Sequence, residues 1–388
     1  IVKILGLKYG IKYTDTSSLR YGGVVALADS DVDGSHICGL ILNIFHYFWP
    51  ELVAMGYIGF CSTPIVKVYQ SKTTLSFYTL NDYDAWLEQN RSKQFKAKYF
   101  KGLGTSTAAE ARDALENIDQ KIITFESDEM VDSSINLAFN KDQTTERKLW
   151  LMERYDPKAN IDRTESVVSV SNYINKELSH FSYYDNQRSI PNIMDGLKPS
   201  LRKILHTAIA HLSTSEMKVA QFGAKVAEKT DYHHGEASLM GAVVGMAQNY
   251  VGSNNINLLE PRGAFGSRLA GGADAASPRY IFTQLSDVSK KIFDHRDAQL
   301  LKYLDSDGMP IEPEWFVPVI PMILVNGAMG IGSGFSTTVL QYNPLDICKY
   351  LNDLLDDAKP AKTLMPWYRG FGGTVEKISS GKYRTIGR

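Results

Sequence analysis

The chain has 388 residues, of which 44% are hydrophobic and 22% are charged. This length exceeds what one hydrophobic core usually covers, and the composition excludes a disordered segment, so roughly two or three folded domains are expected. Lys and Arg number 42 against 43 Asp and Glu, which excludes an overall basic character, so any nucleic-acid-binding surface must be local.

Cysteine spacing and apolar patterning exclude two further classes of protein. The cysteines lie far apart and form no C-x-x-C pair, so neither a zinc site nor a disulfide framework is expected, and a reducing intracellular compartment fits. The most apolar stretch, 37–55, is interrupted by polar residues and a proline, which excludes a transmembrane helix. No other stretch resembles a membrane anchor, so no membrane contact is expected. The chain opens at Ile1 without a methionine or a signal-peptide pattern, and residues 381–388 look like mid-domain sequence, so we expect a fragment of a longer protein.

The first part of the chain alternates strand-like and helix-like segments. An apolar run at 24–28 is too short for a helix and predicts a buried strand. Residues 35–48 have helical spacing, with a serine as the expected N-cap and a proline break after them. A strand at 64–69 and a helix at 108–118 continue the pattern, which predicts an α/β domain.

The second part is expected to be mostly helical at first. Residues 141–165 are strongly charged and are interpreted as a connecting segment. Helical periodicity then recurs in segments before and after a Gly-rich stretch at 252–278. The predicted helices are 170–178, 201–212, 238–251 and 345–355. Residues 370–383 are interpreted as the opening of a further β-containing domain.

Three carboxylates, Asp29, Asp31 and Asp33, alternate along the turn that follows the first predicted strand. A bound cation would relieve their repulsion, and oxygen ligands suit Mg²⁺ or Ca²⁺. An EF-hand would need a bidentate Glu at its twelfth position, where this chain has Leu40, and a helix before the loop. A solvated acidic turn is the plain alternative to a metal site.

Arg279 and Tyr280 end the Gly-rich stretch, whose backbone could approach a phosphodiester closely. A tyrosine hydroxyl is a useful nucleophile only when cationic neighbours stabilise its anion, and Arg279 could do so. The chain has 21 tyrosines, and most tyrosines pack structurally, so Tyr280 alone could be one of those.

Two further groups of residues could contact phosphate. His233 and His234 are adjacent, so their side chains diverge and favour phosphate contact or acid/base work over zinc, with a purely structural pair as the alternative. Lys198, Arg202 and Lys203 surround a predicted helix start whose amides would suit a DNA backbone, although such a cluster is often only a solvated helix face.

In this order, the motifs closely resemble the cleavage core of type IIA DNA topoisomerases of the eukaryotic type. The resemblance runs through almost the whole chain. It is carried by LRYG at 19–22, DSDVDGSH at 29–36, TPIVKV at 63–68, YFKGLGTS at 99–106, INKEL at 174–178, RSIPNIMDGLKP at 188–199, YHHGE at 232–236, AQNYVGSNN at 247–255, SPRYIFT at 277–283, EPEW at 312–315 and PMILVNGAMGIGSGFS at 321–336.

The resemblance implies a fold class of α/β plus α+β in several domains. A Toprim (Rossmann-like) domain is expected at 1–140 without its N-terminal part, followed by the connecting segment at 141–165. A winged-helix domain is expected at 166–340, and the truncated start of a tower domain at 341–388.

The resemblance also implies site residues and a reaction. Tyr280 corresponds to the tyrosine that attacks a DNA phosphodiester and forms a 5′-phosphotyrosyl link, and Arg279 to its neighbouring arginine. Arg202, His234 and Lys101 match positions near the scissile phosphate. Ile331 matches an isoleucine that wedges between bases and helps to bend the duplex. The remaining expected DNA contacts are Lys198, Lys203 and His233.

Cofactors and partners follow from the same resemblance. Asp29 and Asp31 would hold Mg²⁺, with Asp33 assisting and a glutamate from an upstream motif completing the site; Mn²⁺ or Ca²⁺ could substitute. ATP would bind only in a separate N-terminal domain, so ATP-driven strand passage would belong to the complete protein. The expected partners are double-stranded DNA and a second copy of the chain, because the family's metal site serves the tyrosine of the other subunit.

The expected setting is DNA replication, in the nucleus for a cellular enzyme or in host cytoplasm for a viral one. Two alternatives stay open: a DNA-bending scaffold without chemistry, and a Toprim nuclease or primase-like enzyme. The chain departs from the family pattern at Met329, where an acidic residue is usual beside the intercalating position, and at Ser200-Leu201, where Gly-Gln is usual.

Overall fold

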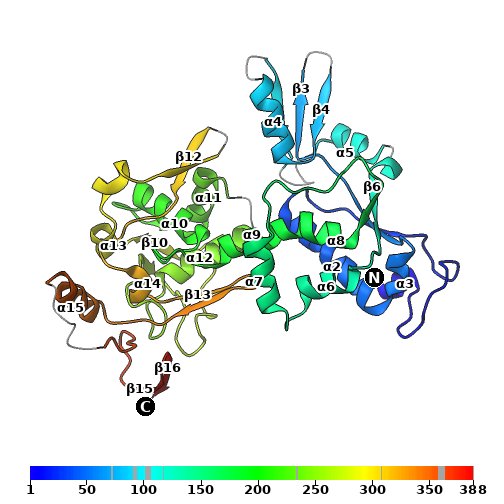
Figure 1. The fold of residues 1–388 in the computed structure, drawn as a ribbon. Coiled ribbons are helices and arrows are strands. Elements are labelled where there is room, and N and C mark those ends of the chain that lie inside the picture. Colours follow the sequence, from blue (N-terminus) through cyan, green and yellow to red (C-terminus); the bar gives the residue numbers. More distant parts are fainter. Residues whose placement is uncertain are drawn as a thin grey trace. The chain divides into compact units, whose positions relative to one another are not determined.

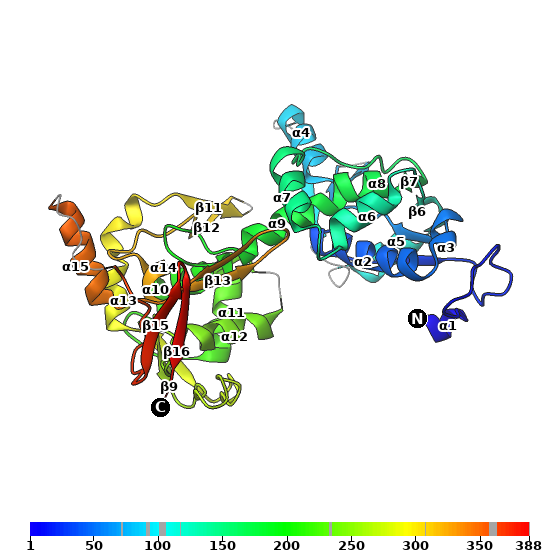
Figure 2. The same cartoon turned by 60° about the horizontal axis from the view of Figure 1, so that its bottom comes forward.

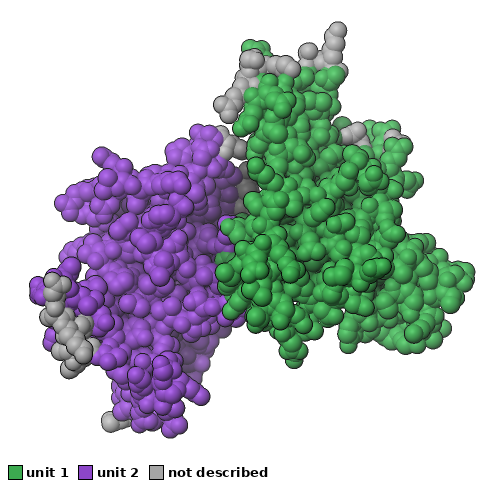
Figure 3. Space-filling model, viewed as in Figure 1, with its two compact units in different colours: residues 1–186, 333–335 green, residues 187–332, 336–388 purple. Residues whose placement is uncertain are grey.

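The structure is a computed structural model. It describes residues 1–70, 73–90, 94–100, 106–116, 118–232, 235–306, 308–356 and 363–387. The chain divides into two compact units, one formed by residues 1–186 and 333–335 and the other by residues 187–332 and 336–388 (Figure 3).

The first unit is built on a four-stranded sheet in the order β1-β2-β6-β7, of which β6 is labelled in Figure 1. β1 (Val24–Ala26) and β2 (Ile58–Cys61) are parallel, β6 (Ile122–Glu126) runs antiparallel to β2, and β7 (Val167–Ser169) is parallel to β6. The connection from β1 to β2 contains α2 (Val32–Phe48) and α3 (Pro50–Ala54), as a parallel pair requires.

Helices cover this sheet and bury a single core. α6 (Val131–Phe139), α7 (Thr144–Glu153) and α8 (Val170–Tyr173) follow β6 and flank β7 in the sequence, and a π-helical segment, Ile174–Leu178, joins α8 to α9 (Ser179–Ser189). The largest fully buried side chains include Phe45 and Trp49 at the end of α2, Phe125 of β6 and Tyr173 of α8. Aromatic packing therefore joins the helices to the sheet.

A smaller sheet in the first unit has the order β4-β3-β5, with β3 (Val66–Tyr69) between β4 (Thr74–Phe77) and β5 (Lys96–Tyr99). α4 (Leu80–Asn90) supplies Tyr83 to its core, beside Val66 and Val68. The remaining helical elements of the unit are α1 (Val2–Leu5), α5 (Ala108–Leu115) and the 3-10 turn Ile118–Gln120.

The second unit combines three helices with a three-stranded antiparallel sheet. The helices are α10 (Pro199–His211), α11 (Val219–Thr230) and α12 (Glu236–Ala247). The strands, in the order β8-β10-β9, are Met217–Lys218, Phe282–Leu285 and Leu259–Arg262. Ile204, Phe222 and Val243, one from each helix, are fully buried in a common core with Leu259.

Short elements complete the second unit. They are α13 (Asp287–Ile292), the 3-10 helix His295–Gln299, β11 (Tyr303–Ser306), β12 (Met309–Pro313), α14 (Met322–Val325), β13 (Ala328–Ile331), β14 (Ser336–Val339), α15 (Pro344–Leu355), β15 (Thr374–Ser379) and β16 (Lys382–Ile386). β11 pairs with β12, β13 with β14, and β15 with β16, each as an antiparallel hairpin; Figure 2 shows the last of these most clearly.

The predicted helices and strands are found, with shifted ends. The expected N-cap Ser35 is wrong, because the Asp31 side chain caps α2 and the helix starts at Val32. The compact units divide after Asn186, whereas the resemblance places the start of the second domain at 166, and the domain bounds stay a prediction. The reason is that β7 pairs with β6, which ties residues 167–169 to the first sheet.

Candidate functional site

The acidic motif of the first unit lies directly beyond β1, at the start of α2. Asp31 is the N-cap of α2, and one oxygen of its carboxylate accepts a hydrogen bond from the Gly34 amide at 2.7 Å. This cap satisfies an otherwise unpaired amide, and the positive end of the helix favours the carboxylates of Asp31 and Asp33. Asp29 and Asp31 are exposed, and Asp33 is partly exposed.

Gly34 fixes how closely the helix approaches the strand. A Cβ atom at this position would lie only 1.9 Å from the Asp29 carbonyl oxygen, so no other residue fits without a backbone shift. The next turn is held from the other side, where the Tyr173 hydroxyl donates to the Ser35 carbonyl at 2.7 Å. Strand end, acidic turn and helix start therefore form one rigid corner.

The donor chemistry of this corner fits a hard divalent cation, because all the available ligands are carboxylate oxygens. Within the described ranges, however, no group of three or more His, Cys, Asp or Glu side chains is arranged to hold a metal ion. The Asp31 oxygen that caps α2 is already engaged. A cation bound here would therefore need ligands beyond these three carboxylates.

In the second unit, Tyr280 stands at the tip of a short turn. Its side chain is 71% exposed, and its amide donates to the Ser277 carbonyl at 2.9 Å. The Arg279 guanidinium lies 5.6 Å from the centre of the Tyr280 ring, within cation–π range. The two residues predicted to act together are thus adjacent, exposed and in contact.

The backbone on both sides of this pair is anchored to α11. The amides of Val219 and Ala220, the first two of the helix, donate to the carbonyls of Ile281 and Pro278, each at 3.0 Å. Helix starts have unpaired amides, and here the flanks of the turn satisfy them. Since Ile281 is also buried, the chain is fixed before and after the pair while both side chains point outward.

Arg202 does not lie at the surface. Its side chain is 6% exposed, and its guanidinium donates to both carboxylate oxygens of Asp195, at 2.7 and 3.0 Å, and to the Leu197 carbonyl at 2.9 Å. Asp195 is fully buried and also accepts the amides of Leu197 and Phe316. The geometry gives Arg202 a role in holding the loop before α10, and its predicted phosphate contact stays a prediction.

The two lysines of the basic cluster differ. The Lys203 side chain is 15% exposed, and its ammonium contacts Glu312 at 2.8 Å and the Thr230 carbonyl at 2.6 Å. This arrangement favours a structural role, and the predicted DNA contact of Lys203 stays a prediction. A buried carboxylate keeps a nearby cation as its counter-charge, which is why Lys203 points inward. Lys198, the N-cap of α10, is partly exposed and has no side-chain partner among the described residues.

Ile331 ends β13 and is 74% exposed, next to the equally prominent Met329 at 66%. Other apolar side chains of the chain are as exposed, such as Ile193 at 79%, so the exposure of Ile331 fits the predicted wedge without singling it out. Three predicted site residues lie outside the described residues: Lys101, His233 and His234.

The sequence did not predict a role for Asp195 or Glu312 as the buried partner of a cation. Both residues belong to motifs that carry the family resemblance, but no spacing pattern links Glu312 to Lys203.

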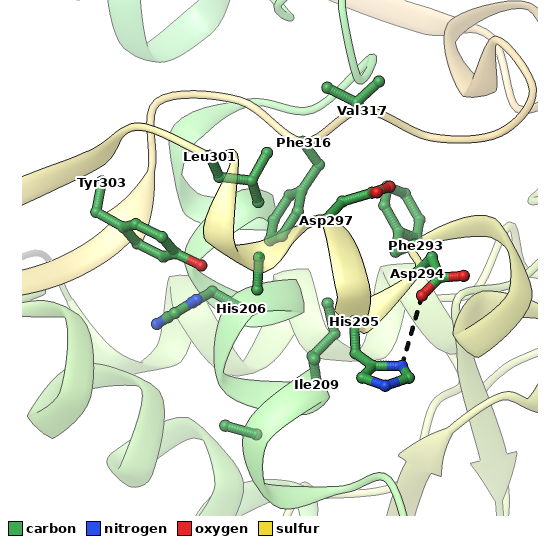
Figure 4. A pocket seen from close by; sticks show the side chains of 12 residues that line it. His206, Ile209, Phe293, Asp294, His295, Asp297, Leu301, Tyr303, Phe316 and Val317 are labelled. Carbon is green, nitrogen blue, oxygen red and sulfur yellow. Dashed lines mark ion pairs between the residues drawn. The ribbon is translucent and has the colours of Figure 1, made fainter.

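One pocket of about 110 Å³ lies in the second unit, between α10 and the 3-10 helix His295–Gln299 (Figure 4). Leu301, Phe316 and Val317 provide apolar lining, and His206 and Tyr303 face each other at one side. Burial lowers the pKa of His206. No predicted site residue lines this pocket, so it plays no part in the site described above.

Comparison with known proteins finds two family models. The model for the A subunit of DNA gyrase/topoisomerase IV matches residues 188–388, and the model for the C-terminal associated domain of TOPRIM matches residues 61–186. The two matches meet where the compact units divide. In the described part of the chain, no helix has the length and apolar character needed to cross a membrane.

Several characterised proteins are similar over the whole chain. DNA topoisomerase 2 of Saccharomyces cerevisiae is 47% identical, and the mitochondrial DNA topoisomerase 2 of Dictyostelium discoideum is 46% identical. The matches cover 100% of this chain but only 28% and 30% of those proteins, so the chain spans less than a third of their length. A crystal structure of the Plasmodium falciparum topoisomerase II DNA-binding, cleavage and re-ligation domain matches with a TM-score of 0.80 and 42% identity, covering 100% of this chain and 53% of that one.

Proposed function

Because this chain belongs to the type II DNA topoisomerase family, we propose that it forms the DNA-gate core that breaks and rejoins double-stranded DNA. The observation that carries the proposal is the exposed Arg279–Tyr280 pair on a turn anchored on both sides to α11. A nucleophile for a large polymer must be accessible and held still at the same time, and this turn provides both.

The proposed reaction is a transesterification. The Tyr280 oxygen bonds to a DNA phosphorus, the bond from phosphorus to the 3′ oxygen breaks, and the 3′ hydroxyl leaves with a proton. Rejoining reverses these steps and needs no external energy, because the phosphotyrosyl link keeps the phosphoester bond. Arg279 stabilises the tyrosine anion and the charge on phosphorus. His234 is assigned, by the family resemblance, to the same phosphate.

Asp29 and Asp31, with Asp33 assisting, are proposed to hold a divalent cation, Mg²⁺ in the cell. When bound, this cation would supply charge stabilisation at the scissile phosphate. Further ligands would come from an acidic residue upstream of this chain and from water or DNA. Mn²⁺ or Ca²⁺ could occupy the same oxygen ligands.

The remaining assignments also rest on the family. Double-stranded DNA and a second copy of the chain are the proposed partners, and ATP hydrolysis and strand passage are assigned to parts of the complete protein outside this chain. The proposed location is intracellular: the nucleus for a cellular enzyme, host cytoplasm for a viral one. Lys198, Lys101 and His233 are the proposed backbone contacts, and Ile331 the proposed wedge.

The test uses the full-length protein with Mg²⁺ and a labelled duplex, denatured during the reaction and mapped by peptide mass spectrometry. We expect a DNA adduct on Tyr280 that disappears in Tyr280→Phe. Tyr47→Phe is the matched control, because Tyr47 is similarly exposed, at 77%, but lies on α2. DNA that is bound and bent without any adduct would favour the scaffold, and cut ends without a protein link would favour a nuclease.

A further inference from the structure

The hairpin that carries Ile331 has a base built from side-chain amides. Its strands pair from Ala328 opposite Val339 to Ile331 opposite Ser336. At the base, a Cβ on Gly327 would lie 2.6 Å from the Val339 carbonyl oxygen, so the two arms approach as closely as a glycine allows. The tip of the hairpin is held separately, since the Ser333 carbonyl accepts the Asn186 side-chain amide at 3.0 Å and the Ser333 hydroxyl donates to Asp185 at 3.1 Å. The contacts just outside the arms therefore set the direction of the hairpin at its base.

Asn255, at 3% exposure, bonds the backbone on both sides of the hairpin. Its amide nitrogen donates to the carbonyls of Val325, at 2.9 Å, and Tyr342, at 3.2 Å, which flank the hairpin in the sequence. The same nitrogen donates to the Trp367 carbonyl at 3.0 Å, and the side-chain oxygen accepts the Arg369 amide at 2.8 Å. One buried side chain thus bonds the backbone of three separate segments, with its two N–H groups shared among three carbonyls.

Two more amides repeat the pattern. Asn326 bonds both backbone groups of Ile256, accepting its N–H at 2.9 Å and donating to its carbonyl at 2.8 Å. Gln341 donates to the Ser253 carbonyl, at 2.5 Å, and to the Asn326 carbonyl, at 2.8 Å. We call Asn255, Asn326 and Gln341 the amide clamp.

We propose that the amide clamp positions the Ile331 hairpin, so that the wedge can transmit force to DNA and hold it bent. The proposal rests on the wedge role given to Ile331 under the proposed function. Unstacking a base step costs free energy. A hairpin that is free to tilt at its base would tilt away from the DNA instead of separating the bases. The clamp has no exposed charge of its own, so it should matter for bending and not for holding the DNA backbone.

The test measures bending separately from binding in the full-length protein. A duplex with a dye at each end reports bending by energy transfer, and titration reports affinity. Gln341→Met keeps the side-chain volume, removes two hydrogen bonds and also removes a buried oxygen that has no partner among the described residues, so it should fold well. Asn255→Ser is the second clamp variant, and Ile331→Ala is the reference for a lost wedge.

In both clamp variants we expect the bent-to-straight ratio of bound DNA to fall about tenfold, equivalent to ~1.4 kcal/mol. The affinity should fall by no more than that factor, and its salt dependence should stay unchanged because no phosphate contact is lost. Asn257→Ser is the matched control: Asn257 bonds the Leu259 carbonyl and the Arg369 side chain but neither arm of the hairpin. It should bend DNA like the unmodified protein. Normal bending by clamp variants that melt at the usual temperature would overturn the proposal.

A second measurement separates the clamp from the wedge. If the Ile331→Ala protein bends DNA normally, the wedge role of Ile331 fails. The positioning of the hairpin by the amide clamp is then tested in the protein without DNA. Spin labels at Met329→Cys and at a position on α12, in a protein whose native cysteines are replaced, give the distance distribution between hairpin and body. A broadened distribution in Gln341→Met and Asn255→Ser supports the clamp as the positioning device, and an unchanged one rules it out.

Discussion

The Lys203 ammonium lies 2.8 Å from one carboxylate oxygen of Glu312 and 2.9 Å from the other, although the two residues lie 109 positions apart in the chain. Lys198, five positions earlier on the same helix start, has no partner among the described residues. The two lysines therefore offer a matched comparison.

Lys198→Gln should weaken DNA binding and lower the slope of log affinity against log salt by about 1, because one phosphate contact is lost. Lys203→Gln should leave that slope unchanged and instead destabilise the fold by ~3 kcal/mol, because Glu312 stays buried without its counter-charge. Salt titrations and chemical denaturation measure the two effects. A reduced slope in Lys203→Gln would show that this lysine does reach DNA.

Replacing Arg202 by Met should destabilise the second unit by ~3–5 kcal/mol, because Asp195 would remain fully buried with its charge unpaired. The comparison is Arg262→Met, which breaks exposed ion pairs with Glu216 and Glu260 and should barely change stability. Denaturant unfolding measures both variants. Equal effects from the two substitutions would contradict a buried structural role for Arg202.

Gly34→Ala should be destabilising by ~1–3 kcal/mol, although alanine normally favours a helix, because the added carbon would collide with the Asp29 carbonyl. The shift should also weaken Mn²⁺ binding at the acidic corner, measured by electron paramagnetic resonance. Gly22→Ala is the control, since a Cβ there meets nothing within 4 Å. If the Gly34→Ala protein is destabilised but binds Mn²⁺ with unaltered affinity, the geometry of this corner does not determine metal binding.

Burial raises the pKa of the Cys38 thiol from its ordinary value of 9.0 to about 11. The folded state therefore retains this proton more tightly than the unfolded state, so the associated stability is complete below about pH 9 and declines as the pH rises through 11. At pH 8, iodoacetamide should modify the partly exposed Cys348 before Cys38. Rapid labelling of Cys38 in the folded protein, followed by mass spectrometry, would disprove its protection.

The sequence allowed much of the fold and the core of the site to be predicted, because the signals are local. The apolar run before Asp29 predicted β1, and the fold class of α/β plus α+β is confirmed. The start of α2 was misplaced because Ser35 and Asp31 are both good caps, and only the hydrogen bond to Gly34 decides between them.

What could not be predicted depends on contacts between distant segments. The basic cluster at Lys203 looks the same in the sequence whether it faces solvent or Glu312, since nothing near Lys203 signals the carboxylate. Asn255 likewise gives no sign that its partners are Val325, Tyr342 and Trp367. Such residues become visible only when the fold brings their partners together.

The anchoring of the Tyr280 turn has a mechanical consequence. In the proposed covalent state, any pull on a severed DNA end passes through Tyr280 into the chain on either side of it. There the load reaches the carbonyls of Pro278 and Ile281 and is transferred to the first turn of α11. These two backbone hydrogen bonds pass the tension to a packed helix, so the turn that carries Tyr280 does not move as a free loop would. The broken DNA end therefore stays close to the position in which it can be rejoined.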